Sequence, residues 1–378
     1  MNAATEFLPK STRESLIQTV FLGLVIVIIW GAVSSARTNL SDLGISSGFA
    51  FLDRATGWGY SFSLFDRSID DTYARTLFIG FTNTLFLGLI SIVFATILGI
   101  IMGTLRDAKN IALKSFATVF VQIFRNIPLI LQLVFWYAVL IHMPGPRQSY
   151  SFLDAVFLSN RGMMIPWLNV PPLAAVVILL LAAALAFVLF RWSGMRPLKK
   201  IGLWLAGSIM IAMLIGAVFK PEGEALFSIP ALEGLRFAGG LTISIELVAM
   251  VISIILYGSS YIAEVVRGGL KEVPKGLVEA GQSLGLSPTN IWLRIRMPMA
   301  LRTIIPPLGN QWIFLMKATT IGVAIGFSDL FMIVSTSITQ SGQTLELMGI
   351  LMASFLLINF SLALLVNALN SRLQLKGH

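Results

Sequence analysis

Long apolar runs, separated by short polar segments, dominate this chain of 378 residues. Long stretches without Asp, Glu, Lys or Arg include residues 76–105, 162–190, 201–219 and 347–371. Each can form an α-helix that crosses the hydrocarbon core of a bilayer, which takes about 20 residues. The alternation of apolar and polar residues that marks a membrane β-barrel is absent, so the pattern predicts membrane-spanning helices.

The complete pattern predicts an all-α membrane protein with about eight transmembrane helices. Their expected ranges are 16–35, 76–104, 116–141, 171–190, 201–219, 238–267, 302–326 and 343–371. Two longer polar segments, 37–75 and 142–170, are rich in Gly, Pro, Ser and aromatic residues. Because each is too short to bury a core of its own, we expect irregular structure there.

The first apolar run allows two interpretations. Lys10 and Arg13 precede residues 16–33, and small residues follow at 34–36, an arrangement that also fits a cleaved signal peptide. The run is longer than the core of a typical signal peptide, and most of the remaining chain is itself membrane-spanning. Both observations favour an uncleaved spanning helix.

Composition and charge agree with a multi-pass membrane protein. Hydrophobic residues make up 56% of the chain and charged residues 12%, and the mean hydropathy is +0.84. With the N-terminus inside, 17 of the 27 Lys and Arg residues lie in cytoplasmic segments and eight in outer segments. This excess places both termini and the 269–300 loop in the cytoplasm. The net charge of +9 is therefore assigned to loop bias and not to nucleic-acid binding.

Residue content excludes several kinds of chemistry. The chain has no cysteine and only two histidines, His142 and His378, which leaves no thiol chemistry, disulfide or His-based metal cluster. No nucleophile and base are arranged for catalysis, and no G-x-x-x-x-G-K-[ST] loop is present to bind ATP. We therefore expect no enzyme activity, no catalytic residues, and no metal or cofactor bound by this chain.

The polar 269–300 loop is predicted to form two short helices at an angle. The first is expected to end at Gly285, because glycine readily adopts the left-handed conformation that ends helices. The second is expected to begin with Ser287 as its N-cap and Pro288 in its first helical position. The loop is therefore predicted to be a structured hairpin.

The first of these helices has two distinct sides. Leu277, Ala280, Gly281 and Leu284 share one side, and Lys275, Glu279 and Gln282 share the other. We expect the apolar side to contact the body of the protein and Glu279 to face outward. The small residues at 280 and 281 are expected to permit close approach of a partner.

The spacing within this loop matches a known motif. The motif begins with Glu279-Ala280-Gly281, and Gly285 follows after three intervening residues. After nine further residues comes the segment Ile295-Arg296-Met297-Pro298. The order resembles the E-A-A, three, G, nine, I-x-L-P signature of importer permeases driven by an ATP-binding cassette (ABC), with Gly281 and Met297 as departures. The resemblance implies docking on a separate ATP-hydrolysing subunit through Glu279, Ala280, Gly281, Gly285, Ile295 and Pro298. An ordinary cytoplasmic loop with helix caps is the alternative interpretation.

Four further segments resemble the polar amino-acid permeases of this group. Residues 261–270 read YIAEVVRGGL, and this resembles the run Y-x-A-E-x-x-R-G-G. The segments 306–311 (PPLGNQ) and 315–320 (LMKATT) resemble P-P-L-G-N-Q and L-K-x-T-S. The segment 124–132 (FRNIPLILQ) resembles F-R-G-T-P-L-L-x-Q, with Asn and Ile in place of G-T.

The resemblance implies a five-helix core of the type I importer permeases. The spans near 76–104, 116–141, 238–267, 302–326 and 343–371 would supply it. Residues 1–75 would add an N-terminal helix and a periplasmic segment, and the transmembrane domain 76–372 would contain a two-helix insertion at about 146–235. Such long subunits resemble those of the general L-amino-acid and the glutamate/glutamine/aspartate/asparagine importers of proteobacteria.

The resemblance also implies a function and partners. The chain would be a multi-pass permease of the bacterial inner membrane that moves polar L-amino acids. A second, non-identical permease chain, two ATP-binding subunits that carry ATP and Mg²⁺, and a periplasmic amino-acid-binding protein would work with it. No nucleic-acid partner is implied.

Charged residues within the spans are candidates for a substrate path. A charge near the membrane centre costs about 3 kcal/mol or more, so such residues usually face a path or a partner. Lys317, Glu246 and Arg125 could contact the carboxylate and ammonium groups of a zwitterionic substrate. Arg125 also fits structural pairing at the cytoplasmic rim.

Other charges in or near the spans have structural interpretations. Glu264 can reach Arg267 one helical turn on, which predicts a structural ion pair. Asp329 and Glu346 flank the outer ends of the last two spans, where we expect solvated rim positions.

An ion-coupled secondary amino-acid transporter is the second functional hypothesis. Intramembrane acidic residues would suit coupling to H⁺ or Na⁺. This hypothesis predicts inverted repeats and broken helices, and the sequence contains no convincing repeat. It also leaves the cytoplasmic hairpin unexplained.

Overall fold

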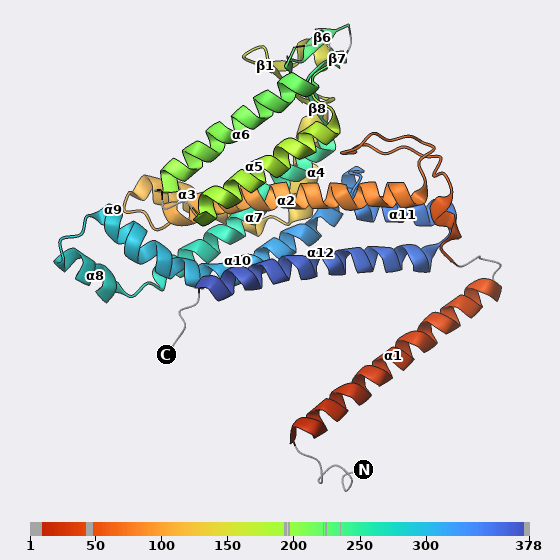
Figure 1. The fold of residues 1–378 in the computed structure, drawn as a ribbon, viewed down its shortest axis with the longest axis horizontal. Helices are drawn as coiled ribbons and strands as arrows, with labels where there is room; N and C mark the ends of the chain where they lie inside the picture. The colour runs from red at the N-terminus through yellow and green to blue at the C-terminus, as the bar shows by residue number, and fades with distance from the viewer. Residues whose placement is uncertain are drawn as a thin grey trace.

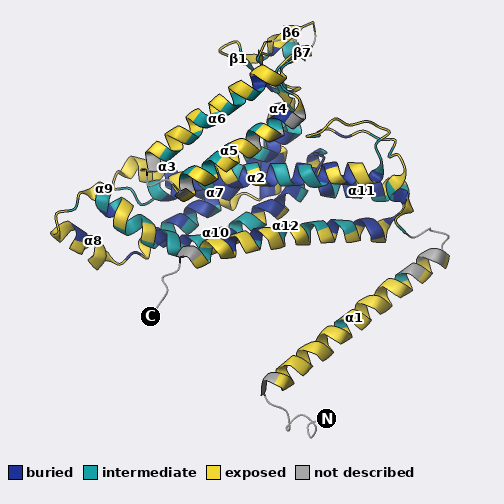
Figure 2. Cartoon of the chain, in the orientation of Figure 1, coloured by how far each residue is buried: buried dark blue, intermediate teal, exposed yellow. Residues whose placement is uncertain are grey.

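The computed structural model describes residues 10–42, 48–192, 195, 197–221, 223, 225–234 and 236–373. Two long helices, α2 (Tyr73–Leu105) and α7 (Ile245–Lys271), lie side by side at the centre (Figure 1). The helices that pack around them are α3 (Ile111–Asn126), α4 (Leu129–Ile141), α10 (Met297–Ala318), α11 (Leu330–Ser341) and α12 (Thr344–Leu373). Buried residues concentrate where these helices meet (Figure 2).

Two glycines, one helical turn apart on α2, permit its close packing on α7. A Cβ atom at Gly99 would lie 2.6 Å from Cβ of Ile262, and one at Gly103 would lie 2.6 Å from the carbonyl oxygen of Ala263. Small residues with three other residues between them let two membrane helices approach closely. The α2–α7 contact therefore depends on the absence of side chains at these positions.

Replacing Gly99 with valine is expected to destabilise the permease, because the new side chain must displace Ile262. Overpacking of this kind typically costs about 1–3 kcal/mol, and it will lower the thermal unfolding temperature of the purified protein. Gly268→Val is the matched control, since nothing lies within 4 Å of the Cβ position at Gly268. Equal unfolding temperatures for the two variants would contradict this packing.

The prediction of one continuous helix over 116–141 is wrong. The segment forms α3 and α4, whose axes differ by 101°. Pro128 disfavours helical backbone at the residue before it, and Ile127 has φ −94° and ψ 126°. The amide of Gln132 donates hydrogen bonds to the carbonyl oxygens of Phe124 (2.8 Å) and Ile127 (2.9 Å), which satisfies groups at the broken end. Hydropathy does not reveal this break because both sides are apolar.

The span predicted at 302–326 is also more complex than one helix. α10 continues into a 3-10 turn, η4 (Thr319–Ile325), and Gly326 then adopts φ 73°. The unpredicted helix α11 follows at a bend of 49°. The side chain of Asp329 caps α11 by accepting a hydrogen bond from the backbone N–H of Met332 (2.9 Å).

The solvated rim positions expected for Asp329 and Glu346 are wrong. The relative exposure of Asp329 is 0% and that of Glu346 is 8%. Glu346 accepts a hydrogen bond from the backbone N–H of Gly48 at 2.7 Å, which ties the outer segment to α12. Neither acid belongs to a metal site, since the described residues contain no group of three or more acidic, His or Cys residues that could hold a metal ion.

Small antiparallel sheets occupy the outer segment 142–170, where we expected irregular structure, and also residues 227–243. One sheet has the order β1-β2-β3-β8, and two pairs, β4-β5 and β6-β7, flank it. The strands are β1 (Tyr150–Phe152), β2 (Val156–Ser159), β3 (Gly162–Ile165), β4 (Trp167–Leu168), β5 (Phe227–Ser228), β6 (Ala231–Glu233), β7 (Arg236–Ala238) and β8 (Leu241–Ile243). The helix predicted to start at 238 therefore starts at Ile245, because Met163 pairs with Ile243 across the sheet.

Helices α1 (Lys10–Asp42), α5 (Pro172–Trp192) and α6 (Pro197–Phe219) lie outside this bundle (Figure 1). α5 and α6 form a hairpin in which the Trp204 ring N–H donates to the Ala182 carbonyl oxygen at 2.9 Å. α1 is exposed along its described length (Figure 2). Apolar helix surfaces of this kind suit contact with lipid.

The described residues contain five single helices that are long and apolar enough to cross a membrane. The two bent pairs, α3 with α4 and the segment 288–325 with α11, raise this number to as many as seven. The all-α membrane fold is confirmed, whereas the count of eight spans stays a prediction.

Candidate functional site

The predicted hairpin is present between α7 and α10. Helix α8 (Lys275–Ser283) ends before Gly285, which has φ 71°. The backbone N–H of Leu286 donates to the Gly281 oxygen (3.1 Å) and that of Gly285 to the Gln282 oxygen (2.9 Å), which is a Schellman arrangement. The predicted end of the first helix at Gly285 is confirmed.

The second half of the hairpin also begins as predicted. The side chain of Ser287 accepts a hydrogen bond from the backbone N–H of Asn290 (3.3 Å), and α9 (Pro288–Ile291) has proline in its first position. A π-helical turn, η3 (Trp292–Arg296), then connects α9 to α10. Local turn chemistry therefore accounts for both ends of the loop between the helices.

Gly281 closes the hairpin and does not face a partner. It is buried, and a Cβ atom there would lie 2.8 Å from Cδ1 of Ile295 and 3.3 Å from Cγ1 of Ile291. The departure from alanine at this motif position thus has a physical reason. The expectation that a small residue at 281 admits a partner surface is wrong, since the hairpin itself fills that space.

The apolar side of the first hairpin helix is exposed, which differs from what we expected, while Glu279 is exposed as predicted. Leu277 is 42% exposed and Leu284 is 80% exposed, and Ala280 and Glu279 are also exposed. Leu293 on η3 is 57% exposed. An apolar patch on a solvent-facing loop marks a protein interaction surface. The leucines predicted to contact the body instead point away from it.

An ion pair holds the base of the hairpin to the loop after α2. The Arg296 guanidinium lies 2.6 Å from the carboxylate of Asp107, and both side chains are about a quarter exposed. Arg296 also lies over the ring of Trp292, with its Cζ 5.1 Å from the ring centroid. The hairpin is therefore attached to a segment about 190 residues away in sequence.

Glu264 on α7 forms ion pairs with two arginines. It contacts Arg267 on the same helix and Arg106 at the end of α2. The three side chains are 14–28% exposed, so water screens them only partly. Arg106 precedes Asp107 directly, so this cluster continues into the Asp107–Arg296 pair. We call the five residues Arg106, Asp107, Glu264, Arg267 and Arg296 the inner charge network.

Two of the three substrate-path candidates lie near a shared aromatic face. Arg125 is exposed in the last turn of α3, and its guanidinium lies 5.3 Å from the centroid of the Tyr261 ring. Tyr261 packs against Tyr257 (4.8 Å between centroids), and Tyr257 packs against Phe314 of α10 (5.9 Å). Lys317 is exposed on α10, about one turn beyond Phe314.

Sequence reasoning missed these aromatic residues. Tyr257 and Tyr261 are four residues apart on α7, and this spacing predicts a shared face. Their proximity to Arg125 and Phe314 depends on how three helices are rotated against one another. No local pattern contains that information.

The third candidate, Glu246, lies at the other end of α7. It is half-buried in the first turn of α7, after the N-cap Ser244. Fifteen residues separate it from Tyr261, which is about 22 Å along a helix. The structure therefore does not bring Glu246 together with Arg125.

Comparisons with known proteins agree over nearly the whole chain. Residues 201–375 match the family described as "Binding-protein-dependent transport system inner membrane component". YhdX of Escherichia coli (strain K12) is 37% identical over 99% of this chain and 97% of its own length. The general L-amino acid transport system permease protein AapQ of Rhizobium johnstonii is 34% identical, over 96% of this chain and 92% of its own length.

A third relative has the same extent. The glutamate/glutamine/aspartate/asparagine transport system permease protein BztB of Rhodobacter capsulatus is 32% identical, over 96% of this chain and 94% of its own length. Its similarity, like that of AapQ and YhdX, includes the hairpin, the bundle and the residues between them. The chain belongs to the amino-acid ABC transporter permeases.

Proposed function

We propose that this chain is one permease subunit of an importer that moves polar L-amino acids across the bacterial inner membrane. The similarity to the L-amino-acid permease AapQ and the glutamate/glutamine/aspartate/asparagine permease BztB supports this class of substrate. The chain itself has no Walker A loop, so separate subunits bind ATP and Mg²⁺ and hydrolyse the nucleotide. The chain binds no cofactor of its own in this proposal.

The proposed assembly contains four kinds of component. A second, non-identical permease chain completes the path, two ATP-binding subunits lie in the cytoplasm, and a periplasmic amino-acid-binding protein delivers the substrate. The distribution of Lys and Arg supports cytoplasmic termini. The bundle within 76–372 is the proposed importer domain, with residues 1–75 and the 146–235 insertion as additions to it. The α5–α6 hairpin, which packs mainly on itself, supports the insertion.

The hairpin is the proposed contact with the ATP-binding subunit. The observation that carries this proposal is the exposed face formed by Leu277, Ala280 and Leu284 beside Glu279. An amphipathic helix that presents an apolar face can lie in a groove of a partner. In this proposal Gly281, Gly285, Ile295 and Pro298 shape the hairpin, and Glu279 and Ala280 meet the partner.

Replacing Leu284 with glutamate is expected to detach the ATP-binding subunit. At 80% exposed the side chain supports little of the fold, while in the complex the new charge is buried without a partner. Co-purification of the ATP-binding subunit with the tagged permease should fall at least about tenfold, a loss of about 1.4 kcal/mol.

Ile111→Glu is the matched control for this experiment. Ile111 is also 80% exposed, at the start of α3 and outside the hairpin. It should leave co-purification unchanged. An ordinary cytoplasmic loop predicts equal co-purification for the two variants, and that result would overturn the proposed contact.

The inner charge network is the proposed route from the hairpin to the bundle. Movement of the hairpin pulls on Asp107 through Arg296, and Arg106 and Glu264 pass that displacement to α2 and α7. These two helices share the most extensive contact in the bundle, so in this proposal they move as one body. ATP-driven closure of the cytoplasmic subunits thereby changes which side of the membrane the path faces.

The substrate path is proposed along the face that carries Arg125, Tyr261 and Lys317. Cationic side chains suit the carboxylate of an amino acid, and aromatic faces suit its ammonium group. Glu246 is proposed at the outer end of the same path, where its carboxylate suits the ammonium group. The support is the exposure of Arg125 and Lys317 within a membrane-spanning bundle.

A further inference from the structure

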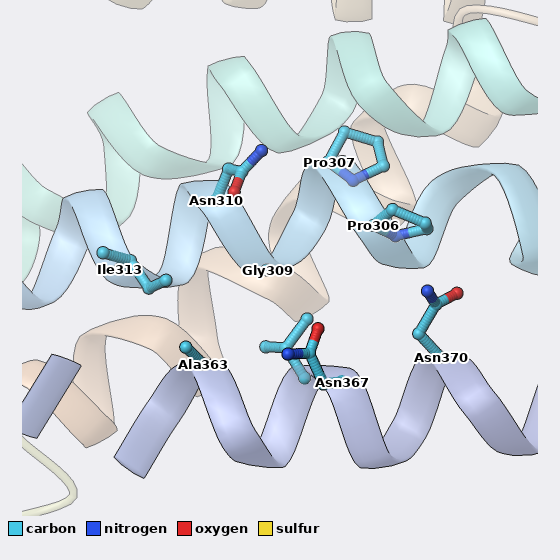
Figure 3. Close-up of a pocket in the computed structure, with 9 residues that line it drawn as sticks. Pro306, Pro307, Gly309, Asn310, Ile313, Ala363, Asn367 and Asn370 are labelled. Carbon is cyan, nitrogen blue, oxygen red and sulfur yellow. The ribbon is translucent and has the colours of Figure 1, made fainter. Parts of the chain in front are cut away.

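A groove of about 470 Å³ lies between α10 and α12. Pro306, Pro307 and Asn310 line it from α10, and Asn367 and Asn370 line it from α12. Figure 3 shows the side chains of Asn367 and Asn370 extending from α12 towards α10. We call it the amide groove after its three asparagines, which are at least partly exposed. Its volume falls within the range of roughly 300–1,000 Å³ that is usual for small-molecule sites.

The amide groove has hydrogen-bonding capacity that the chain itself does not use. Within the described ranges, the side chains of Asn310, Asn367 and Asn370 make no hydrogen bond, and each offers two donors and one acceptor oxygen. Pro306 and Pro307 lie inside α10 and lack backbone N–H groups. The hydrogen-bonding groups of the groove are therefore mainly the asparagine amides.

Neither lipid nor a closely packed helix suits this groove. An amide group left unpaired in hydrocarbon costs several kcal/mol. Helices that associate in membranes do so through small residues. The glycine of this groove, Gly309, already serves the contact between α10 and α12. A Cβ atom at Gly309 would lie 2.3 Å from Cγ1 of Val366, so its space serves the packing of α10 on α12. The other α10 residues of the rim are Pro306, Pro307, Asn310 and Ile313.

The groove continues the proposed path towards the cytoplasm. Asn310 and Lys317 are seven residues apart on α10, which is about two turns, so they share a side of the helix. Phe314 lies between them and joins the aromatic face of Tyr257. Asn367 and Asn370 lie near the inner end of α12, which ends at Leu373.

We propose that the amide groove binds the transported amino acid as a zwitterion on the inner half of the path. Asparagine N–H groups donate to the carboxylate, and the asparagine oxygens accept from the ammonium group. No side chain in the lining is charged, so the groove favours amino acids with uncharged polar side chains, such as glutamine, over glutamate or arginine. This inference rests on the proposed substrate path.

The test compares the complete native importer in proteoliposomes with a double variant that carries Asn310→Leu and Asn367→Leu. Radiolabelled L-glutamine uptake per ATP hydrolysed is expected to fall at least tenfold, while assembly and stimulation of ATP hydrolysis by the binding protein stay unchanged. Ser361→Leu is the control, since Ser361 is exposed on α12 outside the groove. It should transport normally.

Two results would overturn the proposal that the amide groove binds the transported amino acid. Unchanged uptake per ATP in the double variant would show that substrate does not use it. Loss of the second permease chain from the purified complex would show that the groove is a contact between subunits. If the unmodified complex showed no ATP-driven uptake at all, the proposed function itself would fail. This outcome can be distinguished from the two results that overturn the amide groove.

A charge series at Asn310 separates substrate binding from a structural role. Asn310→Lys is expected to raise the ratio of glutamate to glutamine uptake several-fold, and Asn310→Asp to lower it, because each adds a charge beside the bound side chain. A purely structural role predicts the same change in ratio for both variants, and that outcome would contradict the proposal.

Discussion

Replacing Glu264 with leucine is expected to destabilise the permease by about 3 kcal/mol. The substitution leaves Arg106 and Arg267 without their shared partner in a partly buried cluster. Removing one partner of a buried ion pair costs roughly 3–5 kcal/mol, and the exposure of 14–28% places this cluster at the lower end. The measurement is the thermal unfolding temperature of the purified chain.

Two further variants isolate the reason for this loss. Glu272→Leu is the matched control, because Glu272 is exposed at the end of α7 and forms no ion pair among the described residues. Adding Arg106→Met to Glu264→Leu should recover part of the stability, since one uncompensated charge is removed. An unfolding temperature equal to that of the control would contradict the role given to Glu264.

Reversing one charge of the Asp107–Arg296 pair is expected to separate ATP hydrolysis from transport. In Asp107→Arg the hairpin base meets a like charge at a position where the native pair is 2.6 Å apart. Amino-acid uptake should fall about tenfold, which corresponds to about 1.4 kcal/mol. ATP hydrolysis should continue but no longer respond to the binding protein, because the hairpin no longer moves with α2.

The reciprocal exchange tests whether the contact itself matters. Asp107→Arg combined with Arg296→Asp restores an ion pair in which the two charges have exchanged places. Uptake should then recover to within a few-fold of the native rate. Lys109→Asp, in the same loop and exposed, is the control and should transport normally. Failure of the double variant to exceed either single variant would remove the pair from the proposed route.

The ion-coupled transporter hypothesis predicted broken helices, and the breaks at Ile127 and Gly326 agree with it. It also drew support from acidic residues in the spans, and three of these have structural roles. Asp329 caps α11, Glu346 binds the backbone of Gly48, and Glu264 joins the inner charge network. The family relationship over nearly the whole chain agrees with an ATP-driven permease.

Hydropathy predicted the simple spans well and failed where the chain bends. The ranges expected for α5, α6, α2 and α12 agree closely with the structure. The bend at Pro128 interrupts an apolar segment without changing its hydropathy, so α3 and α4 were not separated. Helix α11 lies between the predicted spans 302–326 and 343–371 and was missed. Strand β8 was missed because its pairing with β3 joins segments about 80 residues apart, whereas β1, β2 and β3 pair locally but have only three or four residues each.

The candidate site divides in the same way. The motif spacing predicted the hairpin, and the residues Gly285, Ser287 and Pro288 predicted its turn, since each acts on neighbouring backbone groups. The exposed side of the hairpin was predicted wrongly. The helical period shows which residues share a side, but it does not show which side the body covers.

The sequence by itself determined that this chain spans a membrane, where its main apolar helices lie, and that a capped hairpin interrupts them. Those features follow from local composition, helical period and turn chemistry. The tertiary structure decided that Arg296 meets Asp107, that Glu264 joins α7 to α2, and that three asparagines share one groove. Contacts between distant residues depend on how each helix is rotated and where it bends, and no local pattern contains those angles.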